Sequence, residues 1–517
     1  MKNAKGIISV LLALMMLFAL VACNSGSTGE TKPENQTAPS TVEKKPDENP
    51  APQTGNETKA DQQTEAPAAE SGEQPSTETA EPAAPAENPP AAEEVKLGGI
   101  TVTEGTWWDQ ATYDPQPPTT EWDQIVADYR AQLEEDHEFT YECIGIQNFG
   151  DYNETLVNSF LEKDPVCSIF RANPETVTAM AAQGLLYDLS TLDAFDFEND
   201  PLWSDKIVDY FTINGAVYAA RPGIDEPRDG LFFNKRMLEE AGYSPDYIYD
   251  LQAAGEWDWA HFEELCAKLT KDIDNDGVTD IYALTTGDGS LIQMGFYTNG
   301  AKFVETDENG LFVDGTLNPA FQEGCEWAVS LIEKGYVRPK MEGDGWDANL
   351  TAFANGKAAM VIAQTWVIGG YFSGMEDDWG FALEPAGPNG VSCAVMYPTA
   401  LAIPSCIDLE TANKIAYAIN EWYHIDRIPE YEEMGVTPLD GYYSQFRDAR
   451  AVDETIMRMV TPGENQVYDS YYLVPNYNIW GYIVNVFNRT QTAAQAIEEN
   501  RPVNQANIDA ANALFAK

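Results

Sequence analysis

An acidic run near the middle of the chain has the residue types and the spacing of a calcium-binding loop. Aspartates alternate with other residues from position 272 onward, and a glycine stands sixth in the run. A hard cation needs six or more oxygen ligands, and the glycine allows the chain to wrap around it. The candidate ligands are Asp272, Asp274, Asp276, the carbonyl of Val278, and Asp280. We expect a stabilising Ca²⁺ in this loop; because Ala283 replaces the usual twelfth-position glutamate, an acidic turn without an ion is the alternative.

Residues that could supply a nucleophile and a base form no recognisable set. The three histidines, His137, His261 and His424, belong to no GxSxG, HExxH or phosphate-loop pattern. The 84 acidic residues contain no pair that stands out for glycoside hydrolysis, which requires two carboxylates. We therefore expect a binding protein without a catalytic cofactor. An exported carbohydrate-active enzyme is the main alternative, and a surface adhesin is a third, which the absence of repeats disfavours.

Strands and helices must alternate in the first part of the folded region to position its polar and aromatic residues. We expect strands at 100–103, 139–146 and 166–170, and helices at 121–135, 152–161 and 175–183. This alternation is typical of a parallel α/β sheet, whose ligands bind beyond the carboxyl ends of the strands. The segments 105–109, 147–149 and 171–173 should therefore share one rim.

The alternation starts again after residue 229. Further strands are expected at 230–234, 282–284, 357–362 and 379–383, and helices at 235–241 and 257–269. Two α/β units predict two lobes with a cleft between them. We assign 97–225 with 392–455 to lobe 1, and 226–391 with 456–517 to lobe 2. Hinge segments are expected at 221–227, at 396–402 and near the start of the final helices.

The N-terminal region has the features of an exported and anchored protein. Lys2 and Lys5 precede an apolar run that is too short for a comfortable membrane span, so residues 1–22 are expected to be a signal peptide. The sequence Leu-Val-Ala-Cys ending at Cys23 resembles the bacterial lipobox, which implies lipidation of Cys23. Residues 23–96 are rich in Thr, Glu, Pro and Ala, which predicts a disordered tether. A plain secretory signal is the alternative.

The net charge indicates which classes of ligand are favoured, and the cysteine pattern indicates whether disulfides are expected. The formal net charge of −54 repels nucleic acid, anionic lipid and acidic sugars, so neutral or cationic ligands are favoured, although the charge could also serve solubility alone. Six cysteines follow Cys23 without a CxxC motif, and we expect buried free thiols rather than disulfides.

Five segments, in order along the chain, resemble the extracellular solute-binding proteins of ABC importers, the family that includes the maltose-binding protein. They are GLFFNKRMLEEAG (230–242), EWDW with Phe262 (256–262), FANGKAAM (353–360), WGF with PAGPNG (379–390) and TAAQAI (492–497). The resemblance implies a two-lobe, periplasmic-binding-protein-like α/β fold of type II that closes by a hinge around its ligand. It also implies a monomer, anchored at the outer face of the cell membrane, that delivers the ligand to an ABC permease.

The resemblance also places ligand contacts. In sugar-binding members a tryptophan at the position of Trp366 stacks on a ring, and Trp480 resembles a second stacking tryptophan. Core packing is the alternative for each tryptophan, and Arg171 could instead pair with a carboxylate. The predicted contacts are Trp107, Trp108, Asp109, Asn148, Arg171, Asn173, Asp288, Trp366 and Trp480, with Gln147, Asp151, Glu175 and Asp229 as further polar candidates. We expect a neutral oligosaccharide as ligand; peptides, polyols and glycerophosphodiesters are the alternatives.

Overall fold

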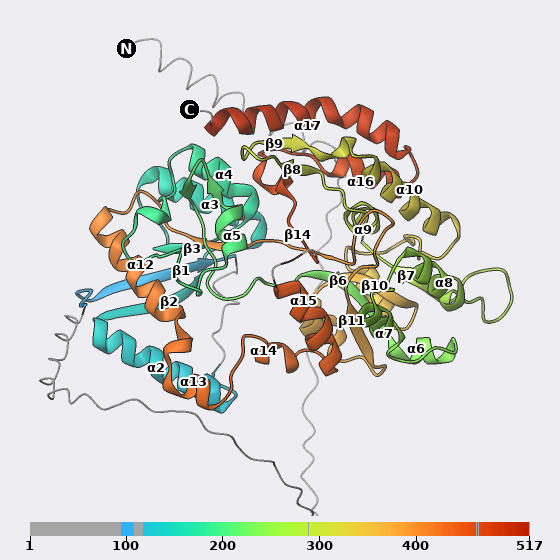
Figure 1. Cartoon of the computed structure of the whole chain (residues 1–517), viewed down its shortest axis with the longest axis horizontal. Helices are drawn as coiled ribbons and strands as arrows, with labels where there is room; N and C mark the ends of the chain where they lie inside the picture. The colour runs from blue at the N-terminus through green and yellow to red at the C-terminus, as the bar shows by residue number, and fades with distance from the viewer. Residues whose placement is uncertain (1–94, 108–116, 288, 462, 464, 516–517) are drawn as a thin grey trace, which may run out of the picture. The chain divides into compact units, whose positions relative to one another are not determined.

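The computed structural model describes residues 95–107, 117–287, 289–461, 463 and 465–515. Two four-stranded sheets organise this part of the chain, and they appear as separate groups of arrows in Figure 1. None of the helices in the described ranges combines the length and the apolar character that a membrane span requires.

The first sheet has the strand order β13-β3-β1-β2. Its strands are β1 (Ile100–Thr106), β2 (Phe139–Gly145), β3 (Ile169–Ala172) and β13 (Ala400–Ala402). β1 is parallel to β2 and β3, as the sequence predicts, and β13 closes the edge in the antiparallel direction. The accompanying helices are α2 (Glu121–His137), α3 (Phe149–Glu162), α4 (Pro174–Ala182), α5 (Asp205–Tyr210), α12 (Leu409–Tyr423) and α13 (Pro429–Glu433), with short strands β4 (Thr212–Ile213) and β5 (Ala216–Val217).

The second sheet has the order β11-β6-β10-β7. Its strands are β6 (Asp229–Asn234), β7 (Tyr282–Thr285), β10 (Ala358–Gln364) and β11 (Trp379–Ala382). Its helices are α6 (Lys235–Glu240), α7 (Tyr247–Ala254), α8 (Trp259–Leu269), α9 (Ser290–Thr298), α10 (Pro319–Glu333) and α11 (Ala348–Ala354), with the hairpin β8 (Val304–Thr306) and β9 (Phe312–Asp314). Gly242 and Gly356 have φ values of 91° and 66°, so a glycine takes the left-handed turn after α6 and the one before β10.

The prediction of parallel strands is wrong for the second sheet. β6 is antiparallel to both neighbours, β10 and β11, while β10 and β7 are parallel. The two strands differ in the end of the sheet at which they begin. β6 begins at the cavity described below, whereas β10 ends there, so the two strands run in opposite directions. One carboxylate of that cavity therefore comes from the start of a strand, where a parallel-sheet rule does not look.

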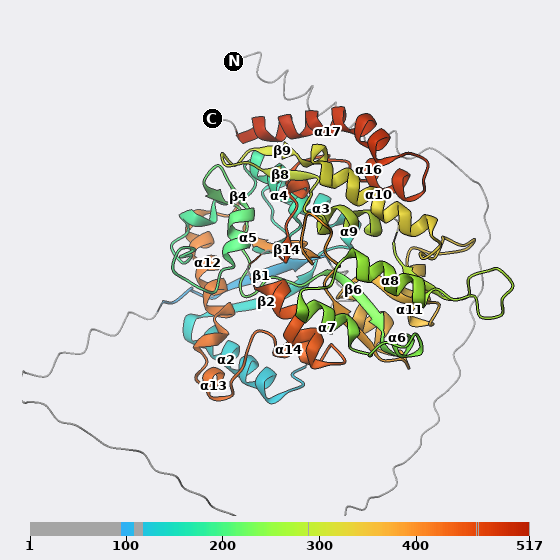
Figure 2. The ribbon, with the colours of Figure 1, turned by 45° about the vertical axis from the view of Figure 1, so that its right-hand side comes forward.

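The C-terminal part of the chain packs mainly on the second sheet. It contains β12 (Ala394–Val395), α14 (Asp440–Tyr443), a π-helical turn η5 (Ala451–Ile456), α15 (Met457–Val460), β14 (Gln466–Val467), a 3₁₀ turn η6 (Ser470–Leu473), α16 (Trp480–Phe487) and α17 (Ala493–Phe515). In both ribbon views α17 lies along α16, α10 and the β8–β9 hairpin (Figure 2).

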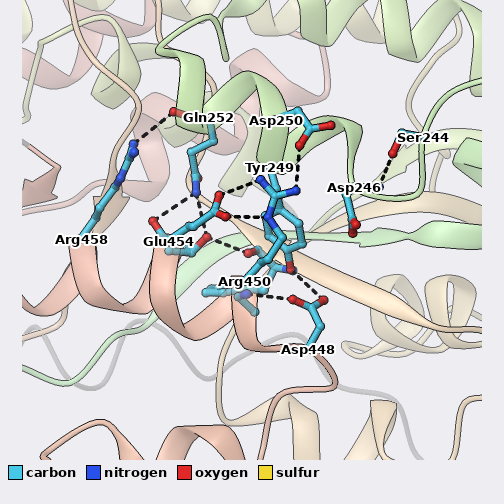
Figure 3. Close-up of polar contacts among 12 residues, drawn as sticks. Ser244, Asp246, Tyr249, Asp250, Gln252, Asp448, Arg450, Glu454 and Arg458 are labelled. Carbon is cyan, nitrogen blue, oxygen red and sulfur yellow. Dashed lines mark hydrogen bonds and ion pairs between the residues drawn. The ribbon is translucent and has the colours of Figure 1, made fainter. Parts of the chain in front are cut away.

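The segment from Asp448 to Arg458 is fixed to α7 by a group of polar contacts, drawn in Figure 3. Asp448 accepts hydrogen bonds from Tyr249 and from Lys235, at 3.2 and 2.9 Å. Arg450 donates to Asp250 at 2.7 Å. These contacts place residues 448–455 with the second sheet, although 392–455 were predicted to belong to lobe 1. Polar side chains that pair across elements leave no periodic pattern in the sequence, so this placement could not be predicted.

Candidate functional site

A cavity of about 490 Å³ lies between elements of the first and second sheets. The first-sheet side contributes the starts of α3 and α4, the second sheet contributes the ends of β6, β10 and β11, and the segment before α16 completes the wall. The lining residues are Phe149, Glu175, Arg228, Asp229, Ser290, Gln293, Ile362, Gln364, Glu384, Val395, Tyr397, Tyr471, Tyr472, Tyr477, Ile479 and Trp480.

Strand register brings three polar side chains to one end of the second sheet. Gln364 is paired with Asp229 across β10 and β6, and its side-chain amide donates to Asp229 at 3.2 Å. On the other side of β6, Ala382 is paired with Leu231. Continuing that antiparallel register by two residues places Glu384 beside Asp229. The edge is therefore acidic, although only Asp229 stands among the residues proposed from the sequence.

Burial controls the ionisation of these carboxyls. It raises the pKa of Asp229 to about 6, against the opposing effect of the Arg228 charge. Burial, reinforced by the charge of Asp229, holds the pKa of Glu384 well above its usual range. Cavity walls with such groups are typical of ligand sites, because a ligand can supply the partner that the folded protein lacks.

A second polar group closes the opposite wall. The hydroxyl of Tyr397 donates to the carboxylate of Glu175, with oxygen distances of 2.9 and 3.0 Å. Arg228 lies over the Tyr397 ring, 5.2 Å from its centroid, and also donates to Glu226 at 3.1 Å. Burial raises the pKa of Glu175. These contacts connect a residue from α4 to residues from both segments that cross between the sheets.

Aromatic rings form the rest of the wall and continue beyond it. Trp480 is 61% exposed and lines both the main cavity and a neighbouring cavity of about 330 Å³. Trp346, which is 75% exposed, lines that second cavity. Trp366, half exposed, stacks near Trp346 with ring centroids 6.4 Å apart, and its indole donates to Gln364 at 2.7 Å. Tyr371 meets both of these indoles edge-on.

Exposure of large indole rings to water is unfavourable, and a group of exposed apolar side chains commonly marks a binding surface. Trp366, Trp346 and Trp480 form a discontinuous row that leads from the second sheet to the mouth of the main cavity. Stacking on flat apolar faces and hydrogen bonding by nearby carboxylates and amides is the interaction that such a row supports. No residue lining the main cavity is a histidine, cysteine or lysine, and the three histidines are engaged elsewhere, with Val95, Asp258 and Asp200.

The structure separates the predicted contacts into groups. Trp480 lines the main cavity, and so do Glu175 and Asp229 from the wider set of polar candidates. Trp366 is next to the main cavity: its indole donates a hydrogen bond to Gln364, which lines the cavity. Trp108, Asp109 and Asp288 lie outside the described residues.

Other predicted contacts have structural partners. Asn148 caps α3, accepting from the main-chain N–H of Gly150 at 3.0 Å, and Gln147 and Asp151 accept from its amide. Trp107 packs edge-on against Phe149 and Tyr152. Asn173 is buried at the start of α4 and donates to Asn153.

Arg171 lies away from the main cavity and pairs with a carboxylate, the alternative considered for it. Its Nε is 2.9 Å from the buried Glu104, which also accepts hydrogen bonds from Tyr141 and Tyr423. This group borders a separate cavity of about 90 Å³.

Sequence reasoning missed Glu384 and Trp346, whereas Phe149 belongs to the predicted rim segment 147–149 and lines the main cavity. Glu384 reaches the cavity only because of the register of β11 on β6, which a single sequence does not specify. Trp346 lies in a loop between α10 and α11, where no strand or helix pattern indicates a site. Its unusual exposure is a property of the fold and leaves no sequence signal.

The predicted calcium loop brings its first three carboxylates together. One ligand atom from each of Asp272, Asp274 and Asp276 lies within 4.8 Å of the others. Asn275 and Gly277 have φ values of 61° and 88°, which wrap the main chain around these oxygens. Asp280 is outside this group and accepts from the main-chain N–H of Ile273 at 2.7 Å. The three converging carboxylates are oxygen ligands of the kind that a hard cation takes, and Asp280 lies outside their group.

The comparisons with known proteins agree with this geometry. The sequence profile described as "Bacterial extracellular solute-binding protein" matches residues 128–410. Among functionally curated proteins, none matches the chain.

Solved structures resemble the fold at low sequence identity. A cyclic α-maltosyl-1,6-maltose binding protein from Arthrobacter globiformis superimposes with a TM-score of 0.58 at 16% identity, over 80% of this chain and 99% of that one. UspC from M. tuberculosis gives 0.55 at 18%, over 80% and 100%. The ABC substrate-binding protein Lmo0181 from Listeria monocytogenes, solved in complex with cycloalternan, gives 0.53 at 17%, over 80% and 98%. At these identities the likeness establishes the fold.

Proposed function

The chain belongs to the bacterial extracellular solute-binding proteins, and from that membership we propose that its cavity captures an oligosaccharide for an ABC importer. One observation carries the proposal: three exposed tryptophans lie around two adjoining cavities, and the wall of the 490 Å³ cavity is rich in tyrosine and carboxylate. Sugar rings present an apolar face and a rim of hydroxyls, and this wall offers a surface for each. The occurrence of oligosaccharide binders among structures of similar fold supports the same choice.

The ligand should be extended and should carry no negative charge. A single sugar ring fills only part of a 490 Å³ cavity, and Trp480 leads directly into a second cavity of about 330 Å³. Acidic side chains in the main cavity disfavour an anionic sugar. Closure of the two lobes around the bound chain, followed by docking on a permease, completes the proposed cycle.

We also propose the anchoring and the metal that the sequence suggests. Cys23 would carry the lipid, residues 24–96 would form the tether, and the protein would act as a monomer at the outer face of the cell membrane. The loop 272–280 would hold Ca²⁺ in a stabilising role, supported by the convergence of three carboxylates. No catalytic step is proposed, because the protein should release its ligand unchanged.

Titration of the purified protein with sugar series tests the proposal. We expect one oligosaccharide series to bind without turnover, and both Trp366→Ala and Trp480→Ala to weaken its binding by about 2 kcal/mol, because each removes a stacking surface. The melting temperature should change little in either variant, since both indoles are at least half exposed.

Trp122→Ala is the matched control. This tryptophan packs on Tyr431 at the outer helices, with ring centroids 5.8 Å apart, and is absent from the cavity walls. Its replacement should lower the melting temperature and leave affinity unchanged. Binding of peptides or polyols, with no response to any sugar, would overturn the carbohydrate assignment; hydrolysis of a bound glycan would favour an enzyme.

A further inference from the structure

Glu384 is a buried carboxylate without a partner in the wall of the main cavity. Only 1% of the residue is exposed, and among the described residues no hydrogen-bond donor reaches its Oε2. Its main chain is fixed, because the Glu384 N–H donates to the carbonyl of Cys393 at 2.9 Å. Buried polar groups almost always have partners, so an unpartnered carboxylate in a ligand cavity indicates that the ligand supplies one.

The surroundings of Glu384 are short of positive charge. Among the described residues, three carboxyl groups, from Glu175, Asp229 and Glu384, and one guanidinium, from Arg228, line the cavity. Arg228 donates from Nη1 to Glu226 and lies over the Tyr397 ring, while its buried Nε has no hydrogen-bond partner among the described residues. Glu175 is held by the Tyr397 hydroxyl, and one oxygen of Asp229 accepts from Gln364. The unsatisfied acceptor capacity is therefore concentrated at Glu384 and Asp229, side by side at the end of the second sheet.

The energetics favour a cationic partner. A carboxylate out of water and beside a second carboxylate is costly, and the raised pKa values of Asp229 and Glu384 reflect that cost. An ammonium group donates three hydrogen bonds and carries the charge that both groups lack. A divalent metal would require about six oxygen ligands, and the neighbouring tyrosines, the Trp480 ring and aliphatic side chains leave too few.

We propose that the captured oligosaccharide contains a basic amino sugar whose ammonium group binds between Glu384 and Asp229. The inference rests on the proposed carbohydrate function and narrows it from sugars without negative charge to cationic ones. The rings of Tyr472 and Trp480 on the same wall suit a sugar that carries such a group, since aromatic faces attract cations and apolar sugar faces alike.

Calorimetric titration with matched probes tests this assignment. The probes are glucosamine oligomers, the same oligomers fully N-acetylated, glucose oligomers of equal length, and the polyamine spermidine. We expect the glucosamine oligomers to bind about tenfold to hundredfold more tightly than either neutral series at neutral pH, because a charge-assisted contact is lost in both neutral series.

Glu384→Gln should remove this preference for the glucosamine oligomers, because the amide retains the shape and loses the charge. Asp229→Asn is the second variant and should reduce the same preference, so the test survives if one of the two folds poorly. Glu256→Gln, an exposed carboxylate outside the cavity walls, is the control and should bind like the parent protein.

The outcomes separate the two proposals. Equal or tighter binding of a neutral series would overturn the ammonium site and leave carbohydrate capture standing. Spermidine binding that Glu384→Gln abolishes, without binding of any sugar, would overturn carbohydrate capture and support cation recognition at Glu384. Failure of every probe to bind would overturn both.

Discussion

At the scale of single residues, the main cavity contains ionisable groups that reduce the stability of the ligand-free protein and are available to contact a ligand. Asp229 is half-buried beside Glu384, and among the described residues the only hydrogen bond to its side chain comes from Gln364. The folded state therefore resists ionising it, and its pKa rises to about 6. A group of this kind serves ligand binding and does not stabilise the folded state.

Asp229→Asn should therefore stabilise the ligand-free protein in a pH-dependent way. The pKa of Asp229 is higher in the folded state than the value near 3.9 of an unfolded chain, so ionisation costs folding free energy as pH rises from about 4 through 6. Asparagine has no such cost. We expect a gain of about 1–2 kcal/mol in unfolding free energy at pH 7.5, discounted for the solvent in the cavity, and none at pH 4.

Denaturant titrations at the two pH values measure this gain, with the exposed Glu256→Gln as the control that should show none. A gain of equal size at both pH values would contradict the assigned burial cost.

The resemblance to the solute-binding family was enough to predict part of the cavity wall. It placed Trp366 and Trp480 among the contacts; Trp480 lines the main cavity, and Trp366 donates a hydrogen bond to the lining residue Gln364. Glu384 was missed because its position depends on a strand register, and Arg171 pairs with Glu104 outside the main cavity, which was the alternative to a ligand contact.

At the scale of elements, most strands and helices of the two sheets could be predicted from periodicity. The expected helix 121–135 corresponds to α2, and the expected strand 139–146 to β2. The parallel direction of β1, β2 and β3 could be predicted, but the directions in the second sheet could not, because they depend on where the connecting segment enters the sheet, and β6 enters from the cavity end. Local sequence specifies an element; its direction is a property of the packed chain.

The loop 272–280 leads to the element-scale prediction. Because Asp272, Asp274 and Asp276 repel one another when no cation is present, Ca²⁺ should raise the melting temperature of a chelator-treated sample by about 2–5 °C. Asp276→Asn should remove most of that response. Thermal melts with and without Ca²⁺ measure it.

Glu308→Gln, in another exposed acidic turn, is the control and should respond to Ca²⁺ as the parent does. An identical melt in chelator and in Ca²⁺ would favour the bare turn.

At the scale of the whole described unit, the segments that join the two sheets also contribute residues to the cavity wall. The chain passes from the first sheet to the second near 221–228 and returns near 396–399. Arg221 of the first segment donates to the carbonyl and hydroxyl of Thr399 in the second, at 3.3 and 3.0 Å. Arg228 and Tyr397, from the same two segments, line the cavity. Ligand contact and lobe movement therefore involve neighbouring residues.

Binding should accordingly draw the lobes together. We expect the radius of gyration from small-angle X-ray scattering to decrease when saturating ligand is added, because Phe149 and Glu175 approach the ligand from one lobe while Asp229 and Trp480 hold it from the other. The N-terminal region is present in both samples, so the difference reports the folded unit. An unchanged radius with full occupancy would contradict hinge closure.

The distribution of the strands along the chain also has a kinetic consequence. The first sheet lacks its edge strand until Ala400–Ala402 has emerged, and the β8–β9 hairpin lacks its cover until α17 follows. Contacts between such distant segments form slowly and late. We therefore expect the discontinuous lobes to complete their folding only after most of the chain has emerged.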